Sequence, residues 1–189
     1  MRRGCERVVY SEEVIRRRVV TLGRRITEHY SGRGTEELLV LGLLKGSFIF
    51  LADLVGAIHL PLQVDFLIAS SYGSGKQSSG EVSMLYDPST ELTGRDVLLV
   101  EDIVDSGTTL ESVGPLLRAR GPASLEVCAL LHKRAVRLTE EPRWVGFEAP
   151  AEFLVGYGLD HAEDFRNLPF IGSLSARSAG SHEPTHTDG

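Results

Sequence analysis

The stretch Asp96-Val-Leu-Leu-Val-Glu-Asp-Ile-Val-Asp-Ser-Gly-Thr-Thr109 decides how the rest of the chain is interpreted. Residues 96–102 are predicted to form a buried strand that ends in two acids. A helix is expected to follow, from about Thr108 to Arg120, because Gly121 and Pro122 together end a helical pattern. A strand that passes directly into a helix is typical of proteins in which strands and helices alternate.

The same alternation recurs along the chain. LLVLGLL (38–44) is a continuous apolar run, which is typical of a strand in a parallel sheet covered on both faces. Ser11 is a predicted N-cap of an amphipathic helix. The expected helices cover residues 11–30, 48–58 and 108–120, and the expected strands cover 38–44, 64–72, 82–87 (antiparallel), 96–102, 125–131, 144–149 and 153–158. The pattern predicts an α/β fold with a mainly parallel sheet, whose ligands bind beyond the carboxyl ends of the strands.

The bulk properties fit one compact domain, predicted over residues 1–174. The chain has 189 residues and a formal net charge of -6, which argues against a general nucleic-acid binder with a basic face. No apolar run reaches the roughly 18 residues that span a membrane, and the N-terminus lacks a signal-peptide pattern. A cytoplasmic location is therefore expected. Residues 175–189 are rich in Ser, Thr, His and Gly, and are expected to be a disordered tail.

The two cysteines are not expected to carry chemistry. Cys128 lies in an apolar run and is predicted to be a small buried hydrophobic residue, whereas Cys5 is expected near a mobile terminus. Neither belongs to a CxxC pair, so neither a zinc site nor a disulfide framework is indicated.

The turn after residue 100 combines acids with a helix N-terminus. Glu101, Asp102 and Asp105 emerge where a buried strand ends, which is costly unless they meet cations or donors. The small residues Ser106, Gly107, Thr108 and Thr109 follow at the expected start of the helix, where free backbone N–H groups can bind phosphate. The segment therefore predicts a site for a phosphorylated sugar with a metal ion. The alternative is a helix N-cap with ordinary capping acids.

The string Glu101-Asp-Ile-Val-Asp-Ser-Gly-Thr-Thr109 resembles the phosphoribosyl-pyrophosphate motif of the type I phosphoribosyltransferases, and in particular their hypoxanthine-guanine branch. The resemblance extends over residues 11–174. It implies the α/β fold of that family, with a mainly parallel twisted sheet flanked by helices and a small hood formed by terminal segments. It also implies that Glu101 and Asp102 contact the ribose hydroxyls and Mg²⁺, that Asp105 is the general acid/base at N7 of the purine, and that Asp105 to Thr109 enclose the 5'-phosphate.

Other segments carry the same resemblance. Lys45 and Gly46 resemble the pyrophosphate loop, which in this family often has a non-proline cis peptide before the lysine; composition alone would make Lys45 an exposed loop lysine. Ser71 and Tyr72, with the Gly/Ser-rich residues behind them, resemble a mobile lid. The string Gly73-Ser-Gly-Lys76 is a poor match to a Walker loop, so an NTPase is rejected.

The resemblance also assigns a purine site. It implies that Lys133 donates to O6 of the base, that Phe153 stacks on the base, and that Leu154 binds it through the backbone. Many relatives have Val or Ile at the Leu154 position. Asp160 is expected to help hold Mg²⁺ or to meet the base, and Arg166 to clamp pyrophosphate.

The function that the resemblance implies is purine salvage: phosphoribosyl pyrophosphate and hypoxanthine or guanine give IMP or GMP plus pyrophosphate, with Mg²⁺ as cofactor. A homodimer or homotetramer is usual for the family. Two alternatives are a regulatory protein on the same fold that binds nucleotides and RNA, and a weakly active relative that mainly binds nucleotide. The acidic charge and the presence of Asp105, Lys133 and Arg166 count against the first.

Overall fold

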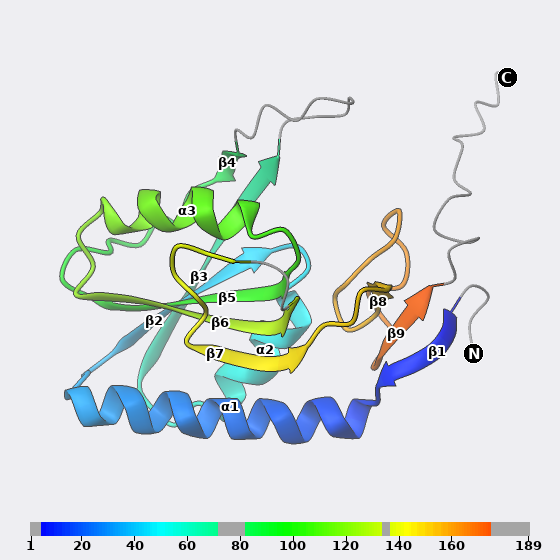
Figure 1. Cartoon of the computed structure of the whole chain (residues 1–189). Helices are drawn as coiled ribbons and strands as arrows, with labels where there is room; N and C mark the ends of the chain where they lie inside the picture. The colour runs from blue at the N-terminus through cyan, green and yellow to red at the C-terminus, as the bar shows by residue number, and fades with distance from the viewer. Residues whose placement is uncertain (1–4, 72–81, 134–136, 175–189) are drawn as a thin grey trace, which may run out of the picture.

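A six-stranded sheet forms the centre of the protein in a computed structural model, which describes residues 5–71, 82–133 and 137–174. Its strand order is β4-β3-β2-β5-β6-β7, and every neighbouring pair is parallel except β3 with β4 at one edge (Figure 1). The strands are β2 (Leu38–Leu44), β3 (Leu62–Ser71), β4 (Val82–Tyr86), β5 (Asp96–Val104), β6 (Ser124–His132) and β7 (Trp144–Glu148). The mainly parallel α/β sheet predicted from the sequence is therefore confirmed.

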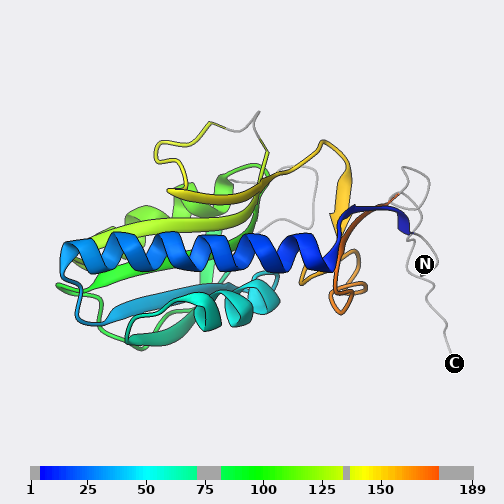
Figure 2. The same cartoon turned by 90° about the horizontal axis from the view of Figure 1, so that it is seen from below.

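In the described part of the chain, three helices cover the two faces of this sheet. Helices α1 (Glu12–Arg33) and α2 (Phe48–Ala57) lie together on one face, and α3 (Thr108–Arg118) lies on the other (Figures 1 and 2). The apolar strand β2 serves both faces, because Leu38 and Val40 belong to the core under α1 and α2 while Leu39 and Leu41 belong to the core under α3. This division explains why the run is continuously apolar rather than alternating.

A second, three-stranded sheet sits beyond the carboxyl ends of the main strands. Its order is β1-β9-β8, with antiparallel pairs, formed by β1 (Cys5–Tyr10), β8 (Phe153–Val155) and β9 (Ile171–Leu174). This sheet brings the two ends of the described chain together (Figure 1), as expected for a hood of terminal segments. Cys5 was expected near a mobile terminus and is instead buried in β1, against Gly172.

Most predicted elements are present with small shifts in their ends. Ser11 caps α1 as predicted, accepting a hydrogen bond from the N–H of Val14 at 3.4 Å. Both cysteines are free, and Cys128 is buried as predicted. The strand predicted over 153–158 was too long: β8 ends at Val155 because Gly156, at φ 95°, turns the chain. The predicted lid residue Tyr72, the loop 73–81 behind it and the tail 175–189 lie outside the described residues.

Candidate active site

The loops after β2, β5 and β6 meet at one edge of the sheet. Chain order reverses between β2 and β5, which is where open α/β sheets bind ligands. The loop after β2 lies against the end of β5 so closely that a Cβ on Gly46 would come within 2.5 Å of Asp102 Cγ. The peptide bond between Leu44 and Lys45 is cis, as the resemblance led us to expect.

Of the three acids at the end of β5, Glu101 is buried, Asp102 is half-buried and Asp105 is exposed. Glu101 is only 6% exposed, and its Oε2 has no hydrogen-bond partner within the described part of the chain. Burial, with repulsion from Asp102, raises the pKa of the Glu101 carboxyl well above its usual range. Burial also raises the pKa of Asp102 to about 6, although backbone N–H groups and the Arg166 guanidinium oppose this shift. The positive charge of Arg166 therefore does not offset the burial of these two carboxylates.

The start of α3 has free backbone donors. Its N-cap is Gly107, at φ 79°, which has no side chain to cap the helix; the N–H of Thr108 donates to Ser106 Oγ at 3.4 Å, and the next N–H groups have no side-chain cap. The nearby hydroxyls of Ser106 and Thr108 bond to each other at 3.0 Å and are exposed, while Thr109 is half-buried. The interpretation of this turn as an ordinary N-cap with capping acids is therefore wrong. An uncapped helix N-terminus flanked by hydroxyls can bind an anion.

Asp105 makes an ion pair across the two neighbouring strand ends instead of capping α3. Its Oδ1 lies 2.6 Å from Lys133 Nζ, because β5 and β6 are adjacent and Val104 pairs with His132. The Asp105 side chain is 62% exposed, so its other oxygen is open to a ligand. The structure thus places a carboxylate and an ammonium group side by side, next to the start of α3.

The loop after β8 completes this edge of the sheet. Gly158 is so close to the carbonyl oxygen of Gly46 that a Cβ there would collide with it, so the loop packs on the turn after β2. Arg166 donates to the Gly158 carbonyl at 2.8 Å and pairs with Asp160 at 2.9 Å. Arg166 Nε is buried and has no partner among the residues that the structure describes. It is therefore an unused donor near Asp102.

Two of the predicted purine residues, Phe153 and Leu154, lie in β8 of the second sheet. Phe153 is 48% exposed, and its ring meets that of His161 edge-on, with centroids 5.2 Å apart. Leu154 is buried and its side chain packs in the core. An exposed aromatic face suits stacking, although a Phe at strand spacing is usually core. Ser71 ends β3 at the same edge of the main sheet, and its side chain is not described.

The three predicted magnesium ligands do not form a ready-made cluster. Within the described ranges no group of three or more His, Cys, Asp or Glu side chains could hold a metal ion. Asp160 pairs with Arg166, although its charge still raises the pKa of Asp102. The protein alone supplies two adjacent carboxylates, Glu101 and Asp102, and a third nearby.

Two contacts near the site were missed by sequence reasoning. Glu163 joins Lys45 and Arg166 through ion pairs of 3.2 and 3.3 Å. Tyr157, buried at φ 51°, donates its hydroxyl to Asp53 of α2 at 2.6 Å and so ties the loop after β8 to the helix after the Lys45 turn. No residue pattern marks either contact, since both depend on how distant loops pack.

A cavity of about 920 Å³ lies away from this edge, between α1, α2 and residues 167–169. Its walls include apolar side chains such as Ile15, Val19 and Ile49. It contains none of the residues predicted from the sequence to bind substrate, so the strand ends are the better candidate for the active site.

A family model and the sequences of known proteins both identify similarity to phosphoribosyltransferases. The family described as "Phosphoribosyl transferase domain" matches residues 14–162. Hypoxanthine phosphoribosyltransferase of Salmonella typhimurium is 48% identical over 168 residues, covering 88% of this chain and 94% of the relative. Hypoxanthine-guanine phosphoribosyltransferase of Dictyostelium discoideum is 44% identical over 171 residues, with the same two coverages, 88% and 94%.

Solved structures of such phosphoribosyltransferases are also similar to this chain. A hypoxanthine-guanine phosphoribosyltransferase from Bacillus anthracis is 40% identical with a TM-score of 0.84, covering 90% of this chain and 99% of that one. The hypoxanthine phosphoribosyltransferase of Trypanosoma cruzi is 37% identical with a TM-score of 0.88, covering 94% and 95% of the two chains.

Proposed function

This chain belongs to the phosphoribosyltransferase family, in its hypoxanthine and hypoxanthine-guanine branch, and from that membership we propose that it is a purine salvage enzyme. It transfers the 5-phosphoribosyl group from phosphoribosyl pyrophosphate to hypoxanthine or guanine, giving IMP or GMP and pyrophosphate. The observation that carries the proposal is the turn after β5, where an exposed carboxylate paired with a lysine stands beside an uncapped helix N-terminus.

The start of α3 binds the 5'-phosphate. Backbone N–H groups from Ser106 to Thr109 and the hydroxyls of Ser106, Thr108 and Thr109 supply the donors, and Gly107 lets the phosphate approach the backbone. Asp105 begins this turn, and we propose that its carboxylate lies next to the sugar that the phosphate anchors. Positioning of this kind supplies much of the rate enhancement in group transfer.

Asp105 and Lys133 act on the base. As the bond from the purine to C1' forms and the bond from C1' to pyrophosphate breaks, Asp105 accepts the proton from N7 of the purine. Lys133 donates to the exocyclic O6, and its 2.6 Å contact with Asp105 keeps the two groups close enough to serve one purine ring. An amino group in place of O6 would leave that donor unpaired, which selects against adenine.

Mg²⁺ fits the residues at the end of β5. The orphaned Glu101 Oε2 and the raised pKa of both acids indicate a site that a cation would stabilise. Mg²⁺ is commonly held by one or two carboxylates together with substrate phosphates, so a preassembled cluster is not required. Glu101 and Asp102 would hold it with help from Asp160, and the bound ion supplies charge neutralisation for the leaving pyrophosphate.

The remaining predicted residues surround the reacting atoms. Lys45, the Gly46 backbone and Arg166 bind the pyrophosphate. Phe153 stacks on the purine, and the backbone of Leu154 hydrogen-bonds to it. Ser71 and Tyr72 belong to a lid that excludes water from the sugar.

The same membership supports a proposal for the assembly and the location. We propose a homodimer or homotetramer in the cytoplasm, acting on phosphoribosyl pyrophosphate and a 6-oxopurine. The helices in the described ranges are too short or too polar to cross a membrane.

A spectrophotometric assay with hypoxanthine, guanine, xanthine and adenine tests the proposal. We expect turnover of hypoxanthine or guanine that depends on Mg²⁺, with adenine much the poorest substrate. A protein that binds IMP but turns over none of the four bases would be a nucleotide-binding protein on this fold instead.

A further inference from the structure

Glu163 stands between the two cations that the proposed function assigns to pyrophosphate. Its Oε1 lies 3.2 Å from Lys45 Nζ, and its Oε2 lies 3.3 Å from Arg166 Nη2. One carboxylate therefore joins the turn after β2 to the loop after β8. Glu163 is the only ion-pair partner of Lys45 among the described residues.

The position of Glu163 is fixed by its backbone. The residue has a left-handed φ of 65°, and its N–H donates to Asp160 Oδ2 at 2.9 Å. The same loop is held against the Gly46 carbonyl by Gly158. The carboxylate thus points at Lys45 and Arg166 because the loop is folded to place it there.

The contacts are of a kind that an incoming anion can replace. A carboxylate presents two oxygens to two cations, much as two oxygens of a pyrophosphate would. The Glu163 and Lys45 side chains are 67% and 64% exposed, and exposed ion pairs are weak. The two cations lower the pKa of the Glu163 carboxyl, so it stays charged at neutral pH.

We propose that Glu163 is a positioning residue that occupies, in the unliganded protein, the anion position between Lys45 and Arg166 which pyrophosphate takes in the substrate complex. The inference rests on the proposed function, since that function makes the two cations a pyrophosphate clamp. Glu163 keeps the clamp assembled while it is empty. It must leave before phosphoribosyl pyrophosphate binds, and its return favours release of the product pyrophosphate.

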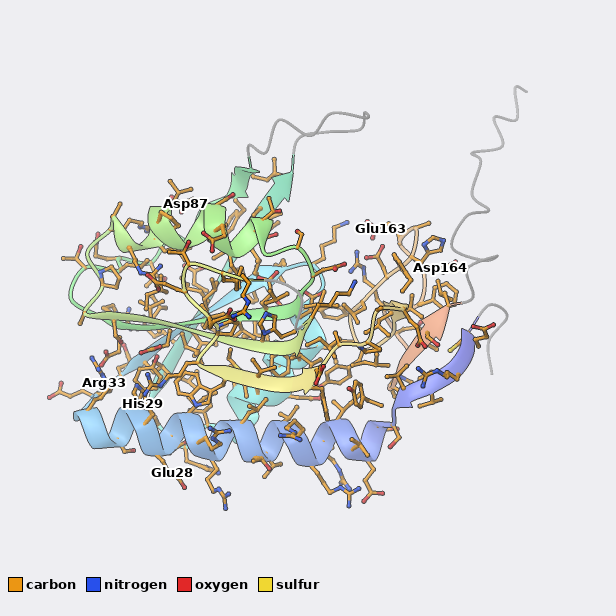
Figure 3. All side chains as sticks on the ribbon, in the orientation of Figure 1. Glu28, His29, Arg33, Asp87, Glu163 and Asp164 are labelled. Carbon is orange, nitrogen blue, oxygen red and sulfur yellow. The ribbon has the colours of Figure 1, made fainter. Side chains whose placement is uncertain are left out.

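The neighbouring Asp164 provides a matched control. Both carboxylates are exposed on the loop between β8 and β9, and in the view of Figure 3 Glu163 lies on the side nearer the main sheet and Asp164 on the side nearer β9. Glu163→Gln and Asp164→Asn remove one negative charge each and keep the side-chain shape. Only the first change removes a charge that contacts Lys45 and Arg166.

The experiment is calorimetric titration of inorganic pyrophosphate, with Mg²⁺ present, into the unaltered chain and both variants. We expect Glu163→Gln to bind pyrophosphate about threefold to tenfold more tightly, because a competing internal anion is gone. Asp164→Asn should stay within about twofold of the unaltered chain, through distant charge alone. In kinetics, Glu163→Gln should lower the KM for phosphoribosyl pyrophosphate and leave the KM for hypoxanthine unchanged.

Pyrophosphate affinity that does not increase in Glu163→Gln would indicate a merely structural role. If Glu163 only braces the loop, Glu163→Gln will bind pyrophosphate equally well or more weakly, and that result overturns the inference while turnover of hypoxanthine leaves the proposed function standing. If the unaltered chain binds no pyrophosphate and makes no IMP, both the inference and the proposed function fail.

Discussion

Gly46→Ala tests how tightly the turn after β2 is confined. The new Cβ would collide with Asp102 Oδ2 and would lie 2.5 Å from Asp102 Cγ, whereas carbon atoms pack at about 3.5–4.0 Å. The turn is also in close contact with Gly158, where a Cβ would collide with the Gly46 carbonyl oxygen. Either the turn or the Asp102 carboxylate must therefore shift by about 1 Å or more.

Overpacking of this size costs about 1–3 kcal/mol. If the shift occurs in the turn, the loss falls on pyrophosphate contacts and raises the KM for phosphoribosyl pyrophosphate by about fivefold to a hundredfold. If the fold absorbs it, the free energy of unfolding falls by the same amount. Gly56→Ala in α2 is the control, since a Cβ there meets nothing within 4 Å, and it should be neutral or stabilising by up to about 1 kcal/mol.

Urea unfolding and steady-state kinetics of both variants give the two quantities. For Gly46→Ala, the loss in the free energy of unfolding and the loss in substrate binding should add up to at least about 1 kcal/mol. Gly56→Ala should show neither loss. An alanine at position 46 with unchanged stability and an unchanged KM would refute the packing argument.

Three further predictions concern the proposed roles. Asp105→Asn should lower kcat by about 10²- to 10⁴-fold and leave pyrophosphate binding nearly unchanged in calorimetry; the reverse pattern would contradict its role. Lys133→Ala should weaken discrimination against adenine, measured as the ratio of kcat/KM for hypoxanthine and adenine, and an unchanged ratio would count against contact with O6. The pKa of Asp102 is raised from its ordinary value of 3.8 to about 6 in the folded protein. Between these two pH values the folded protein keeps a proton on Asp102 that the unfolded chain loses. Without Mg²⁺ the unaltered chain should therefore lose stability, relative to Asp102→Asn, as pH rises from about 4 to about 6, and urea titrations showing a gain would contradict this.

The main sheet could be predicted because its buried strands are visible in the sequence as apolar runs. β2 and the first part of β5 are buried on both faces, so runs such as Leu38–Leu44 are apolar without interruption. The site residues on these strand ends could be located for the same reason, because Glu101, Asp102 and Asp105 interrupt an apolar run where a strand meets a helix. Parallel pairing then brings Lys133 beside Asp105.

The second sheet and the contacts of the loop after β8 could not be predicted in the same way. β1 pairs with β9 across more than 160 positions of sequence, as in Cys5 with Leu174, and neither short strand has a long apolar or alternating pattern. Glu163 was missed because an exposed acid in a loop carries no signal of its own. Its partner Lys45 is placed beside it only by packing of the loop on Gly46.

The most direct test is a crystal structure with IMP and Mg²⁺ bound. It should place the 5'-phosphate on the backbone N–H groups of residues 106–109, N7 of the purine within hydrogen-bond distance of Asp105, and O6 beside Lys133. A phosphate bound elsewhere, or a purine out of reach of Asp105, would contradict the assignment of the turn after β5 as the place where the reaction occurs.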